Sequence, residues 1–277
     1  MTEPNDAKII PELRTLAEEA GREIMKIYRK AERNVTAKKD ESPLTQADLN
    51  ANRVLVRGLA KLTSEMVISE EGDEQGRPPP KGSRGPEPFW LLDPLDGTRD
   101  FVARLDTFVV CIARVVDHYP VLGLIHAPVT GETWWACKGL GCFGPEGQKL
   151  YRTDQRMPPV AAGSRSMPSE RMQVFYDTFG IKNVERIGSA LKFCKLAEGA
   201  VDLYPRFGPT SEWDTAAGQI IAEEAGCQVI EVKTGQRLRY GKAGLLNAGG
   251  FMASRRDLDL IAPLVKAGLI KLTPRKD

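Results

Sequence analysis

The sequence predicts an α/β protein whose N-terminal half is of the α+β type and whose C-terminal half alternates strands with helices. Two observations support this prediction. Apolar runs separated by short turns fill residues 89–139, and short strand-like and helical segments alternate from Val160 onward. The pattern changes within the stretch "RTDQRMPP". We therefore expect two layered domains, 1–155 and 156–277.

The first elements expected are two helices and a short strand. A long helix is predicted over residues 7–33, because its apolar residues recur every three or four positions and Pro11 is tolerated near the start. A polar stretch leads into a second helix, predicted over 49–62, and a strand over 66–69 follows it. The loop 72–88, rich in proline, glycine and charge, then leads into the next strand.

An antiparallel meander is expected next, because three apolar runs are joined by the turns "DHYP" and "TGET". The predicted meander strands cover residues 107–116, 120–128 and 133–139. In the C-terminal half the predicted strands are 160–164, 201–207 and 227–232, and the predicted helices are 169–180, 189–199 and 213–226.

The composition is that of an ordinary soluble globular protein. The 277 residues are 42% hydrophobic and 27% charged, and the formal net charge is +2. That charge is too weakly basic to predict binding to nucleic acid or to a membrane surface. The N-terminal residues lack the pattern of a signal peptide, and the most apolar run contains Arg114, so we expect no integral membrane segment.

Cysteine and histidine usage narrows the chemistry. The five cysteines are scattered without metal-binding spacing, which predicts small buried thiols in a reducing cytoplasm. The two histidines, His118 in a turn and His126 in a strand, are interpreted as structural, which argues against a zinc site or a serine-type triad. Chemistry is therefore expected to rest mainly on oxygen ligands.

Four acidic residues fall at strand ends or helix beginnings, where folds of this class gather ligand sites. They are Glu70, Asp93, Asp96 and Asp214, the last in the first turn of the predicted helix 213–226. Carboxylates without histidine or thiolate partners favour Mg²⁺ or Mn²⁺ over zinc or copper. Singly, each has an ordinary explanation, as a solvated turn, a helix cap or a complement to a helix dipole. The ordered set favours a metal site.

The segment "WLLDPLDGT" places two carboxylates three residues apart across Pro94. We expect the strand to end at Leu92, with Asp93 and Asp96 just beyond it and the carbonyl of Leu95 between them. Like charges at this spacing repel and raise one another's pKa unless a cation lies between them. We expect a pair of metal ions to provide this positive charge.

Gly97 and Thr98 follow directly, and if a helix begins after them their N–H groups are suited to bind phosphate. Metal-binding carboxylates beside an anion-binding turn indicate metal-assisted phosphoryl hydrolysis. In such sites two ions roughly 3.5–4 Å apart can stabilise the attacking and leaving oxygens together.

The motifs "SEE", "WLLDPLDGT" and "EWDTAAG", in this order, resemble the lithium-sensitive, magnesium-dependent phosphatases typified by inositol monophosphatase and fructose-1,6-bisphosphatase. The match extends from Ser42 almost to the C-terminus. Within that superfamily, "GSALKFCKLAEGAVDLYPRFGPTSEWDTAAG" and "LLNAGGFMAS" are most similar to the bacterial 3′(2′),5′-bisphosphate nucleotidases of the CysQ type. The resemblance implies the layered αβαβα sugar-phosphatase fold.

The resemblance also implies roles for particular residues. The implied metal ligands are Glu70, Asp93, Leu95 through its carbonyl, Asp96 and Asp214. The implied catalytic residues are Asp48, Glu70 and Thr98, with Asp48 hydrogen-bonded to Thr98 so that the pair orients and deprotonates a metal-activated water for in-line attack. The implied substrate-binding residues are Asp96, Gly97, Thr98, Arg99, Ser189, Lys192, Arg206 and Asp214.

Some of these assignments leave alternatives open. Lys192 could also be a solvated residue of a helix, and Arg206 could be a surface charge at the end of a strand. The chain also departs from the subgroup: it has "TRDF" in place of "TKEF", Met167 in place of a histidine that stacks on the base, and Ala190 in place of a serine. These departures leave the metal chemistry untouched and bear on the nucleotide.

The expected function is hydrolysis of the 3′-phosphate of adenosine 3′,5′-bisphosphate and its sulfonucleotide relative, with two or three Mg²⁺ ions, Mn²⁺ as a substitute and Li⁺ as an inhibitor. The alternatives are an inositol or other sugar phosphatase of the same fold, and a non-catalytic regulatory protein that binds metal or phosphate. We expect a phosphorylated small molecule as partner and no nucleic acid. The expected protein is a cytoplasmic monomer or homodimer, with loose association with the inner membrane left open.

Overall fold

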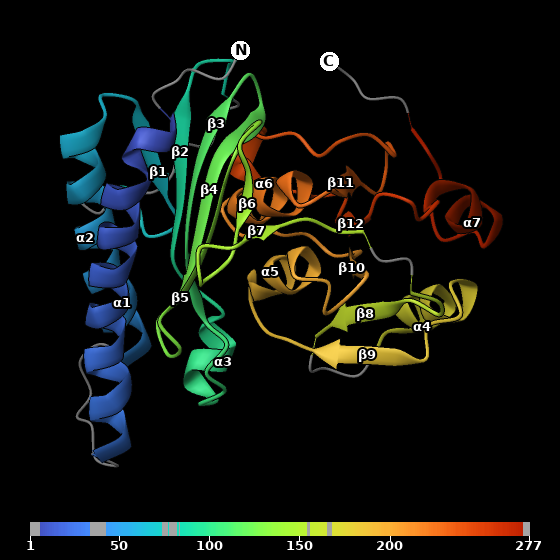
Figure 1. The fold of residues 1–277 in the computed structure, drawn as a ribbon, viewed down its shortest axis with the longest axis horizontal. Helices are drawn as coiled ribbons and strands as arrows, with labels where there is room; N and C mark the ends of the chain where they lie inside the picture. The colour runs from blue at the N-terminus through green and yellow to red at the C-terminus, as the bar shows by residue number, and fades with distance from the viewer. Residues whose placement is uncertain are drawn as a thin grey trace.

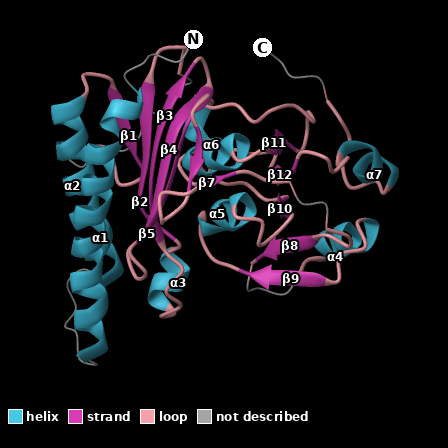
Figure 2. Cartoon of the chain, viewed as in Figure 1, coloured by secondary structure: helices cyan, strands magenta, loops and turns pink. Residues whose placement is uncertain are grey.

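The computed structural model describes residues 6–33, 43–73, 77, 82, 84–153, 156–164 and 168–273. Two β-sheets alternate with three layers of helices, in the order helix, sheet, helix, sheet, helix (Figure 1). The larger sheet lies beside the two long N-terminal helices, and the smaller one lies across the middle layer of helices (Figure 2). The predicted αβαβα layering is confirmed.

The first sheet follows the chain, since its strands pair in the order β1 to β7. Its strands are β1 (Met66–Ser69), β2 (Phe89–Asp96), β3 (Val109–Val116), β4 (Tyr119–Ala127), β5 (Glu132–Cys137), β6 (Gly141–Phe143) and β7 (Lys149–Leu150). The pair β1–β2 is parallel and every later pair is antiparallel. Strands β3 to β5 form the predicted meander.

The second sheet has the order β11-β12-β10-β8-β9. Its strands are β8 (Val160–Gly163), β9 (Asn183–Arg186), β10 (Leu203–Arg206), β11 (Cys227–Glu231) and β12 (Phe251–Arg255). The helical segments of the whole chain are η1 (Asp6–Ile9), α1 (Ile10–Arg33), α2 (Pro43–Leu62), α3 (Thr98–Val102), α4 (Glu170–Thr178), α5 (Leu191–Ala197), α6 (Ala216–Glu224), η2 (Ala243–Leu245) and α7 (Ile261–Lys266).

The outer layer formed by α1 and α2 packs on one face of the first sheet. Helix α1 buries a stripe with helical spacing that includes Leu13, Ala20 and Ile24 and contacts β3 and β4. Helix α2 packs on β2 and begins at Pro43, six residues before the predicted start. Proline is well suited to the first turn of a helix, and residues 43–48, which include Asp48, belong to this helix.

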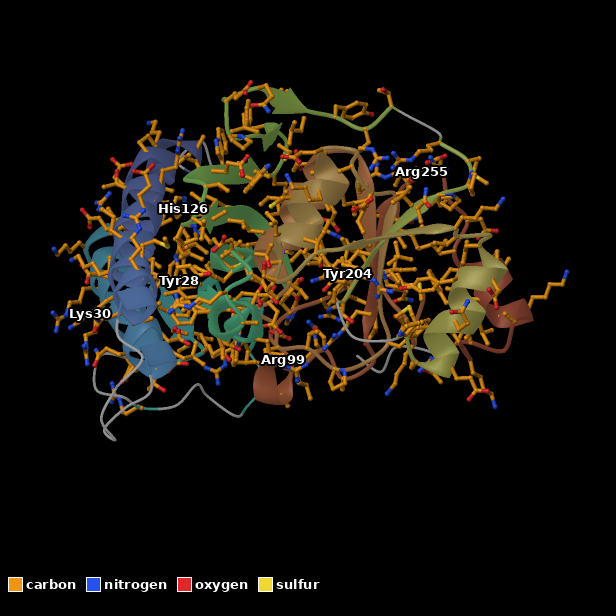
Figure 3. All side chains as sticks on the ribbon, turned by 90° about the horizontal axis from the view of Figure 1, so that it is seen from below. Tyr28, Lys30, Arg99, His126, Tyr204 and Arg255 are labelled. Atoms are coloured by element: carbon orange, nitrogen blue, oxygen red, sulfur yellow. The ribbon has the colours of Figure 1, made fainter. Side chains whose placement is uncertain are left out.

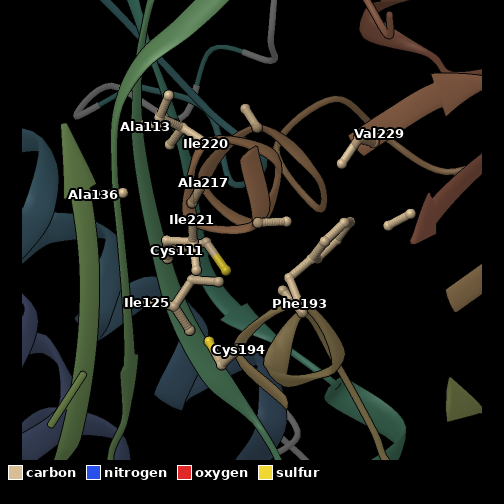
Figure 4. Close-up of a cluster of buried hydrophobic side chains, with 14 of the residues drawn as sticks. Cys111, Ala113, Ile125, Ala136, Phe193, Cys194, Ala217, Ile220, Ile221 and Val229 are labelled. Carbon is tan, nitrogen blue, oxygen red and sulfur yellow. The ribbon is translucent and has the colours of Figure 1, made fainter. Parts of the chain in front are cut away.

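The middle layer, α5 and α6, lies between the two sheets. Figure 4 shows Ile220 and Ile221 of α6 beside Ala113 and Ile125 of the first sheet. The helix approaches β4 closely because Gly123 has no side chain: a Cβ there would lie 2.4 Å from Cγ2 of Ile220. Both sheets contribute to this one buried cluster. The division into domains 1–155 and 156–277 stays a prediction.

Helices α4 and α7 cover the other face of the second sheet. Phe175 of α4 and Leu264 of α7 share a buried cluster with Leu203 and Met252 of that sheet. The edge strand β9 was not predicted, because its residues are mostly exposed and polar and show no apolar alternation.

The segment that connects the sheets is anchored at Asp202, which lies just before β10 and is completely buried. Its carboxylate accepts hydrogen bonds from Arg152 (2.9 Å), Arg156 (3.0 Å) and the N–H of Val160 (2.7 Å), and Arg255 lies 3.5 Å away. In Figure 3, Arg255 lies on the far side of the molecule from Tyr28 and His126, which are near α1.

All five cysteines are buried, as predicted. Among the helices of the described residues, none combines the length and apolar character needed to cross a membrane. Most of the predicted loop 72–88 lies outside the described residues.

Candidate active site

A cavity of about 570 Å³ opens where the end of β2, helix α3, the turn before α5 and the end of β10 meet. Eleven of the twelve residues predicted from the sequence line it. They are Glu70, Asp93, Leu95, Asp96, Gly97, Thr98, Arg99, Ser189, Lys192, Arg206 and Asp214. The two halves of the chain therefore contribute to one site.

Strand β2 continues through Asp96 instead of ending at Leu92 as predicted. A β-bulge interrupts its pairing with β3 between Asp93 and Asp96. Pro94 has no N–H to donate to the sheet, and the N–H of Leu95 donates to Oδ1 of Asp93 (3.0 Å). Pairing with β3 resumes at Asp96, opposite Val109, so the polar end of the strand still belongs to the sheet.

Three carboxylates converge in the cavity. Glu70, Asp93 and Asp214 each place one oxygen so that the three atoms lie within 4.8 Å of one another. The residues come from the end of β1, from β2 and from the turn before α6, respectively. Asp96 lines the same cavity outside this group of three, and its Oδ2 accepts a hydrogen bond from the N–H of Ala190.

Asp214 was expected in the first turn of a helix, but α6 begins two residues later, at Ala216. Oδ2 of Asp214 accepts the N–H of Ser211 (3.0 Å). This bond closes a local turn ahead of the helix, which explains the later start. Gly226 follows the helix with φ 90°, as expected of a helix-ending glycine.

The convergence raises the pKa values of these acids. Burial raises the pKa of Asp93 well above its usual value, and the charges of Asp96, Glu70 and Asp214 act in the same direction. Burial, followed by the charges of Asp96 and Glu70, raises the pKa of Asp214 to about 8. A cation among these carboxylates would relieve their repulsion. The donors are all oxygens, so the residues fit Mg²⁺.

Asp48 lies on α2, behind the acidic group. Burial, followed by the charges of Glu71 and Glu70, raises the pKa of Asp48 to about 8. Its Oδ1 is buried without a hydrogen-bond partner among the described residues, and the expected hydrogen bond to Thr98 stays a prediction. Glu71, interpreted from the sequence as part of a solvated turn, is half-buried and close to Asp48.

The expected phosphate-binding turn is a helix start. Helix α3 begins at Thr98, one residue earlier than predicted, and Gly97 is its N-cap. Gly97 has φ 96°, and a Cβ there would lie 3.1 Å from Cβ of Ser189. Both the backbone angle and the close approach favour glycine. The first N–H groups of a helix have no acceptor within it and can face an anion; here the N–H of Gly97 donates to the carboxylate of Asp96.

Two cationic side chains, Lys192 and Arg206, also line the cavity. The ammonium of Lys192 donates to the carbonyls of Ile187 (3.2 Å) and Ser189 (2.7 Å) and lies 5.0 Å from the centre of the Tyr204 ring. Lys192 is therefore a buried residue and not the solvated helix residue of the alternative interpretation. Arg206 remains exposed at the end of β10.

Arg99 is an exposed residue of the first turn of α3 and lines the cavity. Ser189 has its hydroxyl engaged, since Oγ donates to the carbonyl of Thr107 (2.5 Å). The sequence analysis missed several lining residues, including Asp100 and Tyr204. Asp100 lies inside the quoted motif "TRDF", but nothing in that motif signals its contacts. Met167 lies outside the described residues.

A family model, the inositol monophosphatase family, matches residues 5–268. The 3′(2′),5′-bisphosphate nucleotidase CysQ of Salmonella typhimurium is 40% identical over 238 residues, which cover 84% of this chain and 95% of that protein. The protein of the same name from Escherichia coli O157:H7 is 38% identical with the same coverage.

Two solved structures are similar in fold. CysQ from Bacteroides thetaiotaomicron, described as a bacterial member of the inositol monophosphatase family, has a TM-score of 0.76 and 32% identity, covering 91% of this chain and 98% of that one. Inositol monophosphatase II from Staphylococcus aureus has a TM-score of 0.73 and 19% identity, covering 94% of this chain and 92% of that one. The second likeness concerns the fold alone.

Proposed function

This chain belongs to the inositol monophosphatase family, and from that premise we propose that it is a 3′(2′),5′-bisphosphate nucleotidase. The reaction is Mg²⁺-dependent hydrolysis of the 3′-phosphate of adenosine 3′,5′-bisphosphate, and the related sulfonucleotide is a second substrate. The names and coverage of the curated relatives support the proposal.

The observation that carries the proposal is the presence of both acidic and cationic residues in one cavity. Glu70, Asp93 and Asp214 form an acidic group in the cavity, and Lys192 and Arg206 line the same cavity. The acidic group suits a metal-bound phosphate, and the cationic residues suit a second anionic group of the same substrate. A substrate with two phosphates matches both, whereas a monophosphate uses one.

The residues of the cavity have different roles in the proposed reaction. The family is metal-dependent, generally with Mg²⁺, and Mg²⁺ held by Glu70, Asp93, Asp96 and Asp214 would neutralise phosphate charge and make water a better nucleophile. The N–H groups at Gly97 and Thr98 orient the scissile phosphate, and Asp48 accepts, through the hydroxyl of Thr98, the proton that the attacking water loses.

The proposal includes features that concern the ions and the assembly. We propose that the site holds two or three Mg²⁺ ions, that Mn²⁺ can replace them, and that Li⁺ inhibits the enzyme. A cytoplasmic location is part of the same proposal and is supported by the five buried cysteine side chains. Association with the inner membrane, and the choice between monomer and homodimer, stay predictions.

The test is phosphate release with Mg²⁺ from adenosine 3′,5′-bisphosphate, inositol 1-phosphate and fructose 1,6-bisphosphate, each with and without Li⁺. We expect kcat/KM to be largest for the nucleotide. A preference for inositol or fructose phosphate would replace the nucleotidase by a sugar phosphatase. No release from any of them would favour a regulatory protein that binds metal without turnover.

A pair of variants distinguishes the acidic from the cationic residues of the cavity. Asp96→Asn removes one carboxylate and should abolish turnover of every substrate; full activity would show that the metal assignment is wrong. Lys192→Met removes the buried ammonium and should lower kcat/KM for the bisphosphate by roughly 10- to 100-fold, the loss of one charge-assisted hydrogen bond. Its activity toward adenosine 3′-monophosphate should change little.

A further inference from the structure

The turn before α5, residues 187–190, is fastened to the N-terminal half of the chain by three separate contacts. Oδ2 of Asp96 accepts the N–H of Ala190, and the carbonyl of Thr107 accepts the hydroxyl of Ser189 (2.5 Å). The third contact is made by the carboxylate of Asp100, which lies against Gly188.

The fit between Asp100 and Gly188 is close. A Cβ at Gly188 would lie 1.4 Å from Oδ2 of Asp100 and 2.7 Å from Oγ1 of Thr107, so every other residue type would displace the carboxylate. Gly188 does not have a positive φ, which means that glycine is needed here for space and not for backbone conformation. The hydroxyl of Thr107 donates to the same Oδ2 atom (2.6 Å) and holds it in place.

The same turn also anchors Lys192. The ammonium donates to the carbonyls of Ile187 and Ser189, two residues of the turn. Ser189 has φ 48°, a conformation that costs a non-glycine residue free energy and needs support from its surroundings. That support comes from the bond between its hydroxyl and Thr107. The position of the ammonium is therefore tied, through the turn, to Asp96, an acidic residue of the cavity.

We propose that Asp100 and Thr107 are positioning residues that set the distance between the two phosphate subsites, by fixing the turn 187–190 that carries Lys192. The proposal rests on the proposed nucleotidase function and adds to it a reason for selectivity between bisphosphate and monophosphate substrates. Neither residue acts on the reacting atoms. Their effect is on how well the second phosphate is placed while the first is bound.

Thr107→Val is the test variant, because valine has the shape of threonine without the hydroxyl. Thr107→Ser is the matched control, since it keeps the hydroxyl. We expect Thr107→Val to raise KM for adenosine 3′,5′-bisphosphate about tenfold with kcat changed less than about twofold, and to leave both constants for adenosine 3′-monophosphate unchanged. The serine variant should behave as the parent does.

Binding provides a second readout. Adenosine 5′-monophosphate carries only the second phosphate, and inorganic phosphate occupies the subsite of the first. In Thr107→Val the inhibition constant of adenosine 5′-monophosphate should rise about tenfold, and that of inorganic phosphate should stay the same. Thermal midpoints show whether each variant is folded, and Asp100→Asn provides a second perturbation of the same contact, since it removes the charge of the carboxylate and preserves its volume.

The outcomes are distinct. An unchanged ratio of kcat/KM between the two nucleotides in folded Thr107→Val and Asp100→Asn would overturn the inference while the nucleotidase function stands. Equal losses for both substrates would also overturn it, because they indicate general structural damage. A parent enzyme without preference for the bisphosphate would overturn the proposed function, and this inference with it.

Discussion

The loss of stability expected on substituting Asp202 can be calculated from the contacts of its side chain. The substitution Asp202→Asn keeps the volume of the side chain and removes its charge. The carboxylate is fully buried and faces Arg152, Arg156 and Arg255. The side chains of Arg152 and Arg255 are 3% and 2% exposed, so the variant removes a negative charge that two buried guanidinium groups face, although Arg255 also lies 3.3 Å from Asp257.

Removing one partner of a buried ion pair costs roughly 3–5 kcal/mol. The amide of the variant keeps one oxygen as an acceptor, so we expect a loss near the lower end, about 3 kcal/mol. At roughly 2–4 °C for each kcal/mol in a chain of this size, the thermal midpoint should fall by about 6–12 °C. Arg156 is 40% exposed, and Arg156→Gln should cost less than about 1 kcal/mol.

The assay is urea unfolding followed by far-UV circular dichroism, with the midpoint and the slope fitted separately. An unchanged slope shows that the midpoint reports stability. Two results would contradict this prediction: a loss of less than about 1 kcal/mol in the free energy of unfolding of Asp202→Asn, or an equal loss in Arg156→Gln and Asp202→Asn. Either result would mean that water or local rearrangement compensates the two buried arginines.

Three further predictions concern pH, packing and metal. Burial lowers the pKa of His126 to about 4, so the folded chain resists protonation that the unfolded chain accepts near pH 6.5; stability should fall by roughly 3 kcal/mol as pH drops from 6.5 to 4, and His126→Asn should flatten that part of a urea-midpoint curve against pH. Gly123→Ala should lower the free energy of unfolding by about 1–3 kcal/mol, measured in urea, since its Cβ would lie 2.4 Å from Ile220 and 2.7 Å from the carbonyl of Ala217. Mg²⁺ at 100 times its dissociation constant should stabilise the fold by about 2.7 kcal/mol, and the shift in thermal midpoint should vanish with chelator or in Asp93→Asn; a shift retained in that variant would argue against the carboxylate group as the metal site.

Much of the site was predictable because its residues sit in short motifs. Asp93, Asp96, Gly97 and Thr98 follow one another at the end of an apolar strand, so their chemistry can be interpreted before any tertiary contact is known. Asp214 was identified by the same route, although the start of its helix was misplaced.

The contacts between the two halves could not be predicted. Asp100 and Gly188 are far apart in the chain, and the reason for the glycine is a distance that exists only after folding. The support that Thr107 gives to Ser189 has the same character. Local sequence encodes the reactive groups well, whereas the spacing between them depends on packing.

The bulge in β2 determines which way its two carboxylates point. Side chains of a regular strand alternate between faces, so residues three apart point in opposite directions. Asp93 and Asp96 nevertheless pair with Cys111 and Val109, which are two apart and share a face. The extra residue turns an odd separation into an even one. It also sends Leu95 into the core beneath α1 and α2, where it is fully buried. The ligand-bearing end of the strand is thereby preorganised, and an arriving cation finds its oxygens in place and has little ordering entropy to overcome.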